Sequence, residues 1–557
     1  MEELLRRLGH RPVLFVELVI VSFFINLLAL APSLYVIQLF NRYLAHGIQG
    51  TLITLTVGVM IALVFEVSFR WLRQHIAAAV SAGPDHRLAG AAYGQMLRLN
   101  PGATGHLSVD ARQELLRGVQ KIQQAYAPAN IITFMDLPFS LLILGVLYVL
   151  SPILSLIVAL GLCAALGMGL TAQAMIRGPA GRLAHTGVTQ GKLIHAAVHL
   201  TDLIRGFNGQ ARFRQHWERQ WAGASQLRNR VVNQSAAMLN ATTLVTSLMT
   251  IAVIGTGAVQ VAEGRLTLGA LIGANILAAR ALMPALKFIG LGAQLAESRQ
   301  ALKGLYDLAH LPGEGTGTTR MGELAGQLSL KDLAFVYPGA TTPLFESLTL
   351  DIPPGQILAV VGYNGSGKTT LARILAGLLD PSRGQVLVDG VALSQLDLAW
   401  WRRQLIYLPQ EPEFFAGTLG ENIGINSPEL SARDLHDILE QADIKRFVDT
   451  RPKGLDTGIT QGGRELSLGI RRRLALARAL GTGGQVVIFD EPTEGLDTQG
   501  QAAVYELLNT FARQGKTMIL FSHDRHILKG AGMVVDLSQK PVPAITRAAP
   551  ARKNQVN

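Results

Sequence analysis

The apolar runs in the first half of this chain restrict its fold more than any other feature. Six segments before about residue 290 are each long enough to cross a hydrocarbon core of roughly 30 Å. One such segment alone could be a buried helix of a soluble domain, but six in one half argue against that interpretation. The predicted spans lie at residues 13–40, 52–69, 131–150, 153–175, 241–261 and 268–289.

The connecting loops hold an excess of positive charge, which predicts how the spans are oriented. Residues 70–130 contain seven Lys/Arg against three Asp/Glu, and residues 176–240 contain nine against two. Because basic loops stay in the cytoplasm, both termini and these two long loops are expected inside the cell. Membrane topology therefore accounts for much of the net charge of +11, and we expect no nucleic-acid partner.

The two long loops have regular apolar spacing, which favours helices that continue past the bilayer over disordered basic loops. Among the ionisable residues inside the predicted spans, Glu17, Glu66 and Lys287 lie near span ends, where their side chains can reach water. Asp136 and Arg280 lie deeper, so lining a transport pathway and a purely structural role are equal alternatives for them.

A glycine-rich loop in the second half predicts a phosphate-binding site. It follows an apolar, strand-like run at residues 357–361 and opens a helical pattern. Glycines let the backbone N–H groups turn toward phosphate oxygens, and the helix N-terminus adds positive charge. Lys368 is expected to reach the β- and γ-phosphates, and the Thr369 hydroxyl to bind Mg²⁺. The residues expected to hold the nucleotide here are Gly362, Tyr363, Asn364, Gly365, Ser366, Gly367, Lys368, Thr369 and Thr370.

Two later runs end in polar residues that suit nucleotide hydrolysis. The apolar run 486–490 ends in Asp490, which can hold a magnesium ion, and is followed by Glu491, which can orient or deprotonate a water molecule. The run 518–522 is followed by His523, which can contact the γ-phosphate. Because strand-like runs alternate with helical ones from about residue 327, this half predicts an α/β domain.

The order of these motifs resembles the nucleotide-binding domain of ATP-binding-cassette (ABC) transporters over residues 328–540. The resemblance implies ATP and Mg²⁺ as cofactors, with Glu491, His523 and Gln410 as catalytic residues and Thr369, Gln410 and Asp490 around the metal. It also implies that Tyr337 stacks on adenine and that residues 494–497 form the loop at a dimer interface. Further nucleotide contacts are implied for Ser467, Gly469 and Asp497.

The signature motif at residues 466–470 departs from the usual Leu-Ser-Gly-Gly-Gln. Leu468 replaces the first glycine and Ile470 replaces the glutamine, whereas Ser467 and Gly469 remain. A weakly hydrolysing site is therefore an alternative, although Lys368, Asp490, Glu491 and His523 are all intact. Gln461 stands where exporters of this family often have a glutamate, so coupling to the membrane domain is an open question.

The whole chain resembles ABC exporters, and its membrane half resembles bacterial type I protein-secretion ATPases. The matching residues are 25–31, 136–139, 264–272 and 280–284, while Phe40-Asn41-Arg42 departs from the usual Tyr-Asp-Arg. The first span begins near residue 13, so an N-terminal peptidase-like domain and leader processing are not expected. The resemblance implies a homodimer in the bacterial inner membrane, surrounded by lipid, with a secreted protein substrate, a membrane-fusion protein and an outer-membrane channel as partners.

The predicted fold class is an all-α six-helix transmembrane domain fused to an α/β phosphate-loop ABC nucleotide-binding domain. The predicted domains are residues 1–305 for the membrane part, 306–326 for a flexible linker, 327–540 for the ATPase and 541–557 for a disordered tail. Two functional alternatives remain: an exporter of lipids, glycolipids, peptides or drugs, and a membrane regulator that uses ATP binding as a switch without transport.

Overall fold

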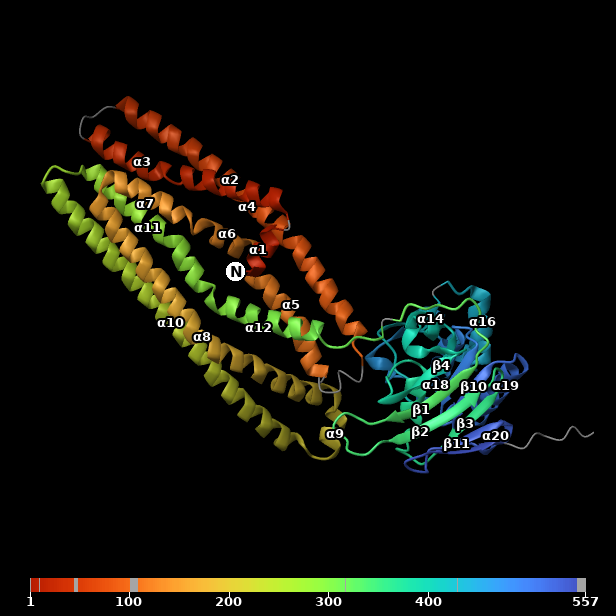
Figure 1. Cartoon of the computed structure of the whole chain (residues 1–557). Helices are drawn as coiled ribbons and strands as arrows, with labels where there is room; N and C mark the ends of the chain where they lie inside the picture. The colour runs from red at the N-terminus through yellow and green to blue at the C-terminus, as the bar shows by residue number, and fades with distance from the viewer. Residues whose placement is uncertain are drawn as a thin grey trace, which may run out of the picture. The chain divides into compact units, whose positions relative to one another are not determined.

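The computed structural model describes residues 2–9, 11–44, 49–100, 109–315, 317–427 and 429–547. The chain forms two compact units, each described here on its own. One comprises Met1–Arg98 with Leu107–Leu311, and the other comprises Leu99–His106 with Pro312–Asn557. Figure 1 labels the helices and strands.

The first unit is entirely helical. Within the described residues, six helical stretches are long and apolar enough to cross a membrane, which confirms the number of predicted spans. The stretches are Pro12–Leu44, Gln49–Arg98, Pro128–Leu150, Pro152–Thr171, Gln210–Ala262 and Leu268–Gly290. The helices are α1 (Glu2–Gly9), α2 (Pro12–Leu28), α3 (Ala31–Gln38), η1 (Leu39–Leu44), α4 (Gln49–Arg98), α5 (Val109–Ala125), α6 (Pro128–Asp136), α7 (Phe139–Leu150), α8 (Pro152–His199), α9 (Thr201–Gly206), α10 (Gln210–Ala262), α11 (Leu268–Gly290) and α12 (Gly292–Ala309).

Three helices continue far beyond the predicted spans. α4, α8 and α10 contain 50, 48 and 53 residues, and α8 and α10 pack along each other (Figure 1). At 1.5 Å per residue α10 is about 80 Å long, more than twice a hydrocarbon core of about 30 Å. The helical continuation expected for the long loops is confirmed in these helices.

Prolines interrupt two of the predicted spans. In the first, α2 ends before Ala31-Pro32, and the π-helix η1 follows α3. In the third, α6 and α7 meet at Leu137-Pro138. Proline lacks a backbone N–H and its ring crowds the preceding turn, which explains both breaks. The sequence had predicted each of these spans as one uninterrupted segment.

The close packing of α11 depends on its small residues. A β-carbon on Gly269 would lie 2.5 Å from the carbonyl oxygen of Ile37, and one on Gly273 would lie 2.4 Å from the Ile37 side chain. Small residues at such positions allow helices to approach each other in a membrane. A buried cluster that includes Leu147, Leu154 and Leu277 holds α7, α8 and α11 together.

The second unit is a two-sheet α/β domain. Its larger sheet has the strand order β12-β11-β3-β10-β9-β6, in which all strands are parallel except β12. A smaller antiparallel sheet has the order β2-β1-β4-β5. The strands are β1 (Leu328–Phe335), β2 (Phe345–Ile352), β3 (Ile357–Val361), β4 (Arg383–Val388), β5 (Val391–Ala392), β6 (Leu405–Leu408), β7 (Gly417–Thr418), β8 (Gly458–Ile459), β9 (Val486–Asp490), β10 (Thr517–Phe521), β11 (Met533–Asp536) and β12 (Ala544–Arg547).

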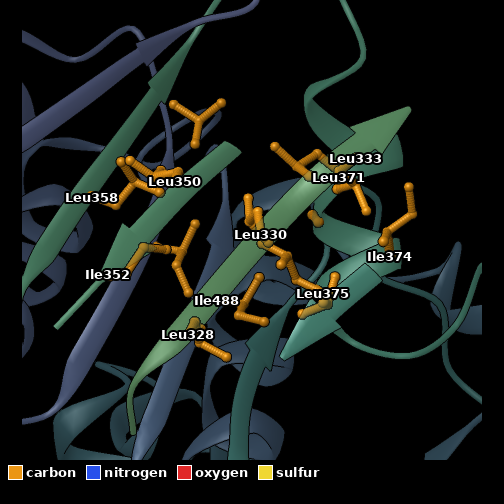
Figure 2. Packing of buried hydrophobic residues seen from close by; sticks show 14 of the residues in the cluster. Leu328, Leu330, Leu333, Leu350, Ile352, Leu358, Leu371, Ile374, Leu375 and Ile488 are labelled. Atoms are coloured by element: carbon orange, nitrogen blue, oxygen red, sulfur yellow. The ribbon is translucent and has the colours of Figure 1, made fainter. Parts of the chain in front are cut away.

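Apolar side chains cover both faces of the larger sheet. On one face Leu358 and Ile488 join the side chains of the smaller sheet and of α13 (Lys368–Leu375), as Figure 2 shows. On the other face Val487 and Phe489 pack against α18 (Leu468–Leu480) and α19 (Thr498–Arg513). The remaining helices are α14 (Leu398–Arg403), α15 (Leu419–Ile423), α16 (Ala432–Gln441), α17 (Lys445–Asp449), α20 (Arg525–Gly530), and the 3₁₀ turns η2 (Leu393–Gln395), η3 (Gly424–Asn426), η4 (Gly454–Asp456) and η5 (Gln461–Gly463).

The prediction of a disordered tail over residues 541–557 is wrong in its first part. Residues 544–547 form β12, which pairs antiparallel with β11 at the edge of the larger sheet. Proline and charge in this stretch suggested disorder, but Val542 and Ile545 have strand character and β11 offers an unpaired edge. Residues 548–557 lie outside the described residues.

The linker predicted at residues 306–326 is only partly free of regular structure. α12 continues to Ala309, and the chain beyond it is fixed to the second unit by polar contacts. The Thr319 N–H donates to the Gln395 carbonyl at 3.1 Å, and Glu314 pairs with Arg402 at 2.8 Å. The C-terminal part of this segment is therefore anchored on the ATPase unit, and the predicted domain boundaries stay predictions.

Candidate nucleotide site

The polar residues predicted for nucleotide chemistry meet at one edge of the larger sheet. β3, β10, β9 and β6 are adjacent parallel strands, so their carboxyl ends lie side by side. The glycine-rich loop follows β3, His523 follows β10, Glu491 follows β9, and Gln410 comes two residues after β6. Open parallel sheets bind their ligands at this edge. The strand order therefore collects residues that are up to 161 positions apart, from Gly362 to His523.

The glycine-rich loop has the backbone geometry of a phosphate cradle. Gly365 and Gly367 have φ angles of 84° and 112°, which a residue with a β-carbon adopts only with strain. A β-carbon on Gly367 would also lie 2.9 Å from the Leu344 side chain. The loop runs directly into α13, whose first residue is Lys368, so a helix N-terminus with its positive end lies at the loop.

Lys368 lies at the centre of a charged cluster. Its Nζ donates to the Gly362 carbonyl at 2.7 Å and lies 2.9 Å from the Nε2 of His523. The same nitrogen is 3.5 Å from Oε1 of Glu491, and that oxygen is 3.8 Å from the Nε2 of His523. The structure thus brings together a buried cation, a carboxylate and an imidazole, the three groups that the sequence assigned to the γ-phosphate and the attacking water.

Asp490 fits a magnesium ligand. It is 1% exposed, and neither of its carboxylate oxygens has a hydrogen-bond partner among the described residues. Burial raises the pKa of Asp490, and the neighbouring charge of Glu491 raises it further. A buried carboxylate without a partner is costly unless a cation compensates it. The Thr369 hydroxyl donates to Oε1 of Gln410 at 3.2 Å, so two more oxygen ligands lie together nearby.

Glu491 has an unusual backbone conformation. Its φ is 49°, in the left-handed region, although it is not glycine and precedes Pro492. Its N–H donates to the Phe521 carbonyl at 2.8 Å, which ties the residue to the end of β10. Such strain is found where a side chain must be held in one direction. The Glu491 side chain points into the Lys368 cluster, as the 3.5 Å contact shows.

Tyr337 is joined to the loop helix through its hydroxyl group. The hydroxyl lies 2.7 Å from Oγ1 of Thr370, and the ring contacts Phe335 edge-on at 4.9 Å between centroids. The ring is 48% exposed, so one face is available for stacking. Tyr363 is exposed as well, and its N–H donates to Oγ of Ser538 at 3.3 Å. Ser366 is fully buried.

The signature residues lie at the start of a separate helix. The hydroxyl of Ser467 caps α18 by accepting from the Ile470 N–H at 3.4 Å, and the carboxylate of Asp497 caps α19 by accepting from the Gly500 N–H at 2.8 Å. That backbone bond lowers the pKa of Asp497. Between described residues, no hydrogen bond or ion pair joins Ser467, Gly469 or Asp497 to Lys368.

The two deep ionisable residues of the membrane unit both have partners. Asp136 pairs with the buried Arg73 at 2.5 Å, and Asn26 lies 3.5 Å from the same carboxylate oxygen. Arg280 donates to the carbonyl oxygen of Ala29. These contacts link α6 to α4 and α11 to α2, which supports the structural alternative for both residues. Sequence reasoning assigned Arg73 to a loop and missed it, because its partner is 63 positions away.

Several residues around the site had no recognisable sequence signal. Lys540 donates to the Ser366 carbonyl at 2.6 Å and also to the carbonyl of Leu344. The Glu346 N–H donates to the Pro541 carbonyl at 2.8 Å. The segment that was predicted to be disordered thus begins by supporting the glycine-rich loop from outside. Only the pairing of β12 with β11, a tertiary feature, places it there.

The fold and this sheet edge define a membrane protein with an attached phosphate-loop ATPase, and comparison with known families agrees. Residues 15–286 match the family described as ABC transporter transmembrane region, and residues 345–494 match the family described as ABC transporter. The chain therefore belongs to the ABC transporters. It is a multi-span exporter of the bacterial inner membrane with a cytoplasmic ATPase domain, and it binds ATP and couples its hydrolysis to transport.

Two curated relatives are similar over nearly the whole chain. Cyclolysin secretion/processing ATP-binding protein CyaB of Bordetella pertussis is 26% identical over 521 residues, which cover 93% of this chain and 73% of CyaB. Leukotoxin translocation ATP-binding protein LktB of Mannheimia haemolytica is 26% identical over 530 residues, which cover 94% of this chain and 74% of LktB.

A solved structure has the same fold. The structure of a bacterial Atm1-family ABC exporter with ATP bound superposes with a TM-score of 0.83 at 18% identity and covers 96% of this chain and 95% of its own. At this identity the likeness concerns the fold alone.

Proposed function

We propose that this protein is the inner-membrane ATPase and permease of a bacterial type I protein-secretion system, and that it works as a homodimer by alternating access. The observation that supports the protein cargo is the similarity to CyaB and LktB, which extends over more than nine-tenths of the chain. Their names describe secretion or translocation of cyclolysin and leukotoxin. The expected partners are a membrane-fusion protein and an outer-membrane channel.

In the proposed reaction each residue of the sheet edge has one task. The loop N–H groups and Lys368 hold the β- and γ-phosphates, and Tyr337 stacks on adenine. Thr369, Asp490 and Gln410 would hold Mg²⁺, which neutralises charge on the phosphate oxygens. His523 contacts the γ-phosphate, and Glu491 orients the water molecule and accepts its proton.

The bond changes follow from these positions. The water oxygen attacks the γ-phosphorus, and the bond from this phosphorus to the oxygen bridging to the β-phosphate breaks. ADP leaves with that oxygen, and inorganic phosphate is the second product. Lys368 stabilises the charge that develops on the transferred group, because its ammonium is held by Gly362 on the loop and faces Glu491 and His523.

The dimer is supported by residues whose implied nucleotide contacts are not made within one copy. Ser467, Gly469 and Asp497 make no polar contact with Lys368 inside the described chain, although the family resemblance assigns them to the nucleotide. In the proposed dimer they close on the ATP of the other copy. Two ATP molecules then hold the cassettes together and bias the membrane helices toward the outward-open arrangement, and hydrolysis releases this state.

An exporter of lipids, glycolipids, peptides or drugs is the main competing proposal, and the Atm1-family likeness fits it equally well. It would use the same ATPase residues, so only cargo recognition separates the two. A membrane regulator without transport is favoured only by Leu468 and Ile470 in the signature. Normal ATP turnover by the purified protein that is lost in Glu491→Gln would count against the regulator.

The cargo can be tested by stimulation of ATP turnover. The full-length protein is reconstituted in vesicles of phosphatidylethanolamine and phosphatidylglycerol, and the ATPase rate is measured with a C-terminal fragment of cyclolysin, the protein in the name of the relative CyaB. We expect several-fold stimulation by the fragment and none by a scrambled version. Stimulation by added lipid A or by a lipophilic drug, without any response to the fragment, would replace the protein cargo by a small amphiphile.

A further inference from the structure

We propose that Arg472 is a positioning residue for Glu491 and that it joins the helix of the signature motif to the water-orienting group of the same subunit. This inference rests on the role proposed above for Glu491. Arg472 is the fifth residue of α18, one helical turn after Leu468. No sequence motif pointed to Arg472, because it is the middle residue of a run of three arginines.

The first observation is where the guanidinium group lies. The Arg472 side chain is only 11% exposed, and its Nη1 donates to the carbonyl oxygen of Glu491 at 3.0 Å. Its Nη2 pairs with the carboxylate of Glu494 at 3.1 Å. Burying a charged group is unfavourable unless it makes hydrogen bonds or ion pairs, so these two contacts hold the guanidinium group of Arg472 in one direction. The direction is toward the backbone of Glu491.

The second observation is the backbone of Glu491 itself. Its φ of 49° is held from two sides, by the bond from its N–H to Phe521 and by the bond from Arg472 to its carbonyl. A left-handed conformation at a residue with a side chain persists only when its surroundings enforce it. Without Arg472 the Glu491 carbonyl keeps only the longer 3.3 Å bond from the Glu494 N–H, and the peptide after Glu491 is held less firmly. The carboxylate would then leave its position 3.5 Å from Lys368.

The third observation gives the unusual signature residue a role. A β-carbon on Gly495 would lie 3.0 Å from Cδ2 of Leu468 and 3.4 Å from Nε of Arg472. Leu468 and Arg472 are one helical turn apart, so they form a single surface on which residues 491–495 lie. The leucine that replaces the usual glycine thus packs on the loop after β9 within the same subunit. A change in the position of α18 is transmitted directly to Glu491.

The test separates positioning from ATP binding and from stability. In the full-length protein, kcat and KM for Mg·ATP are measured for Arg472→Met, which keeps the aliphatic stem, and for Arg472→Lys, which keeps one donor. We expect kcat to fall roughly tenfold for Arg472→Met, with KM changed less than twofold. A reacting group misplaced by about 1 Å can cost about a hundredfold in rate, and a smaller shift of Glu491 should cost less. Lysine should restore part of the loss.

Two further variants control the interpretation. Arg513→Met removes another arginine that donates to a backbone carbonyl, that of Asn509 at 3.3 Å, and should leave kcat unchanged. Gly495→Ala should lower kcat as Arg472→Met does, because alanine is strained at the Gly495 φ of 69° and its β-carbon would meet Leu468 and Arg472. This second variant also serves if Arg472→Met does not fold.

The outcomes are distinct from a failure of the proposed site. If Glu491→Gln abolishes turnover while Arg472→Met and Gly495→Ala keep kcat within twofold of the unchanged protein, the positioning role is wrong. The same holds if the loss for Arg472→Met appears only in KM. If Glu491→Gln itself turns over ATP normally, the proposed role of Glu491 is wrong, and Arg472 has nothing to position.

Discussion

The two units of this protein differ in where their side chains make contact. In the ATPase unit both faces of the larger sheet are covered by core side chains, and the polar residues converge on one edge. In the membrane unit most large apolar side chains along α4 are exposed, and a shallow hollow of about 330 Å³ is lined by Thr56, Val57, Met60, Ile61, Val64 and Phe65. The polar residues of the ATPase unit converge inside its domain, whereas the large apolar side chains of α4 point outward.

This difference decides what a single substitution can do. A change at the sheet edge alters one chemical step, because a particular atom is lost from a particular place. A change in the membrane unit alters packing between helices and acts on stability first. The following variants, in order of decreasing effect, test whether the two units separate in this way.

Lys368→Ala should have the largest effect and abolish ATP binding and transport together. The variant removes the cation whose Nζ lies within 3.5 Å of Gly362, His523 and Glu491. We expect affinity for ATP to fall by at least two orders of magnitude, as for the loss of a buried, charge-assisted contact. The affinity is measured with a fluorescent ATP analogue. Transport that survives in this variant would show that ATP is not the driving ligand.

Glu491→Gln should lower kcat about a thousandfold while ATP still binds. The amide keeps the shape of the side chain but cannot accept the proton of the attacking water, and general-base catalysis contributes about 10²–10⁴-fold. The rate of phosphate release gives kcat, and a binding measurement with the same protein gives the affinity. A variant with less than tenfold loss would require another base near Lys368.

Asp136→Asn should act on stability and spare the chemistry. It leaves the buried guanidinium of Arg73 without its countercharge. Because the Asp136 side chain is 19% exposed, we expect the free energy of unfolding to fall by about 2 kcal/mol, less than for a fully buried pair. Thermal unfolding in nanodiscs measures it, and ATP turnover at 25 °C should stay within twofold. Glu218→Gln is the control, since its pair with Arg214 is exposed and should contribute little. If Asp136→Asn lowered ATP turnover as much as Glu491→Gln, the two units would not differ in the way described.

Asp490→Asn should stabilise the protein in the absence of nucleotide. Because burial raises the pKa of Asp490, this carboxyl group favours the folded state below the ordinary carboxyl pKa, and the favourable contribution is lost as the pH rises through its folded pKa. At pH 8 the asparagine variant should therefore unfold about 2–4 °C higher than the unchanged protein, and at pH 4.5 the difference should shrink. An unchanged Tm at both pH values would mean that the carboxylate is already compensated.

Tyr337→Ala should have the smallest effect on the ATPase unit. Loss of an aromatic face that stacks on a base costs about 1 kcal/mol or more, so affinity for ATP should fall about five- to tenfold. Tyr337→Phe loses only the half-buried hydrogen bond with Thr370 and should stay within a few-fold, because one neutral hydrogen bond adds little. Equal losses in the two variants would assign the role to the hydroxyl group instead of the ring.

The sequence predicted the ATPase unit in more detail than the membrane unit. The loop before Lys368 and the strand before Asp490 are local patterns, and the structure has them as β3 with α13 and as β9. The position of Gln410 beside Thr369 follows from strand order, which only the family resemblance supplied. In the membrane half, hydropathy predicted the number of spans and apolar spacing predicted helices that continue past the bilayer, but neither predicted the proline breaks.

The contacts that were missed join residues far apart in the chain. Arg73 and Asp136 are 63 positions apart, and Lys540 and Ser366 are 174 apart. Arg472 and Glu491 are only 19 positions apart, yet a helix and a strand separate them. Spacing and composition report which face a residue prefers, but they do not report which other element faces it. Long-range polar pairs therefore need the three-dimensional fold.

The hairpin of β11 and β12 has a practical consequence for work with this protein. Ser538 accepts from the Tyr363 N–H and Lys540 donates to the Ser366 carbonyl, so both contact the glycine-rich loop from outside. Pro541 accepts from the N–H of Glu346 in β2. An affinity tag or fluorescent fusion attached directly after Arg547 would be joined to β12, the strand whose pairing keeps these contacts next to the glycine-rich loop. Such tags are better placed after a spacer. Removal of the residues after 540 should weaken the affinity for ATP, even though every recognised motif is intact.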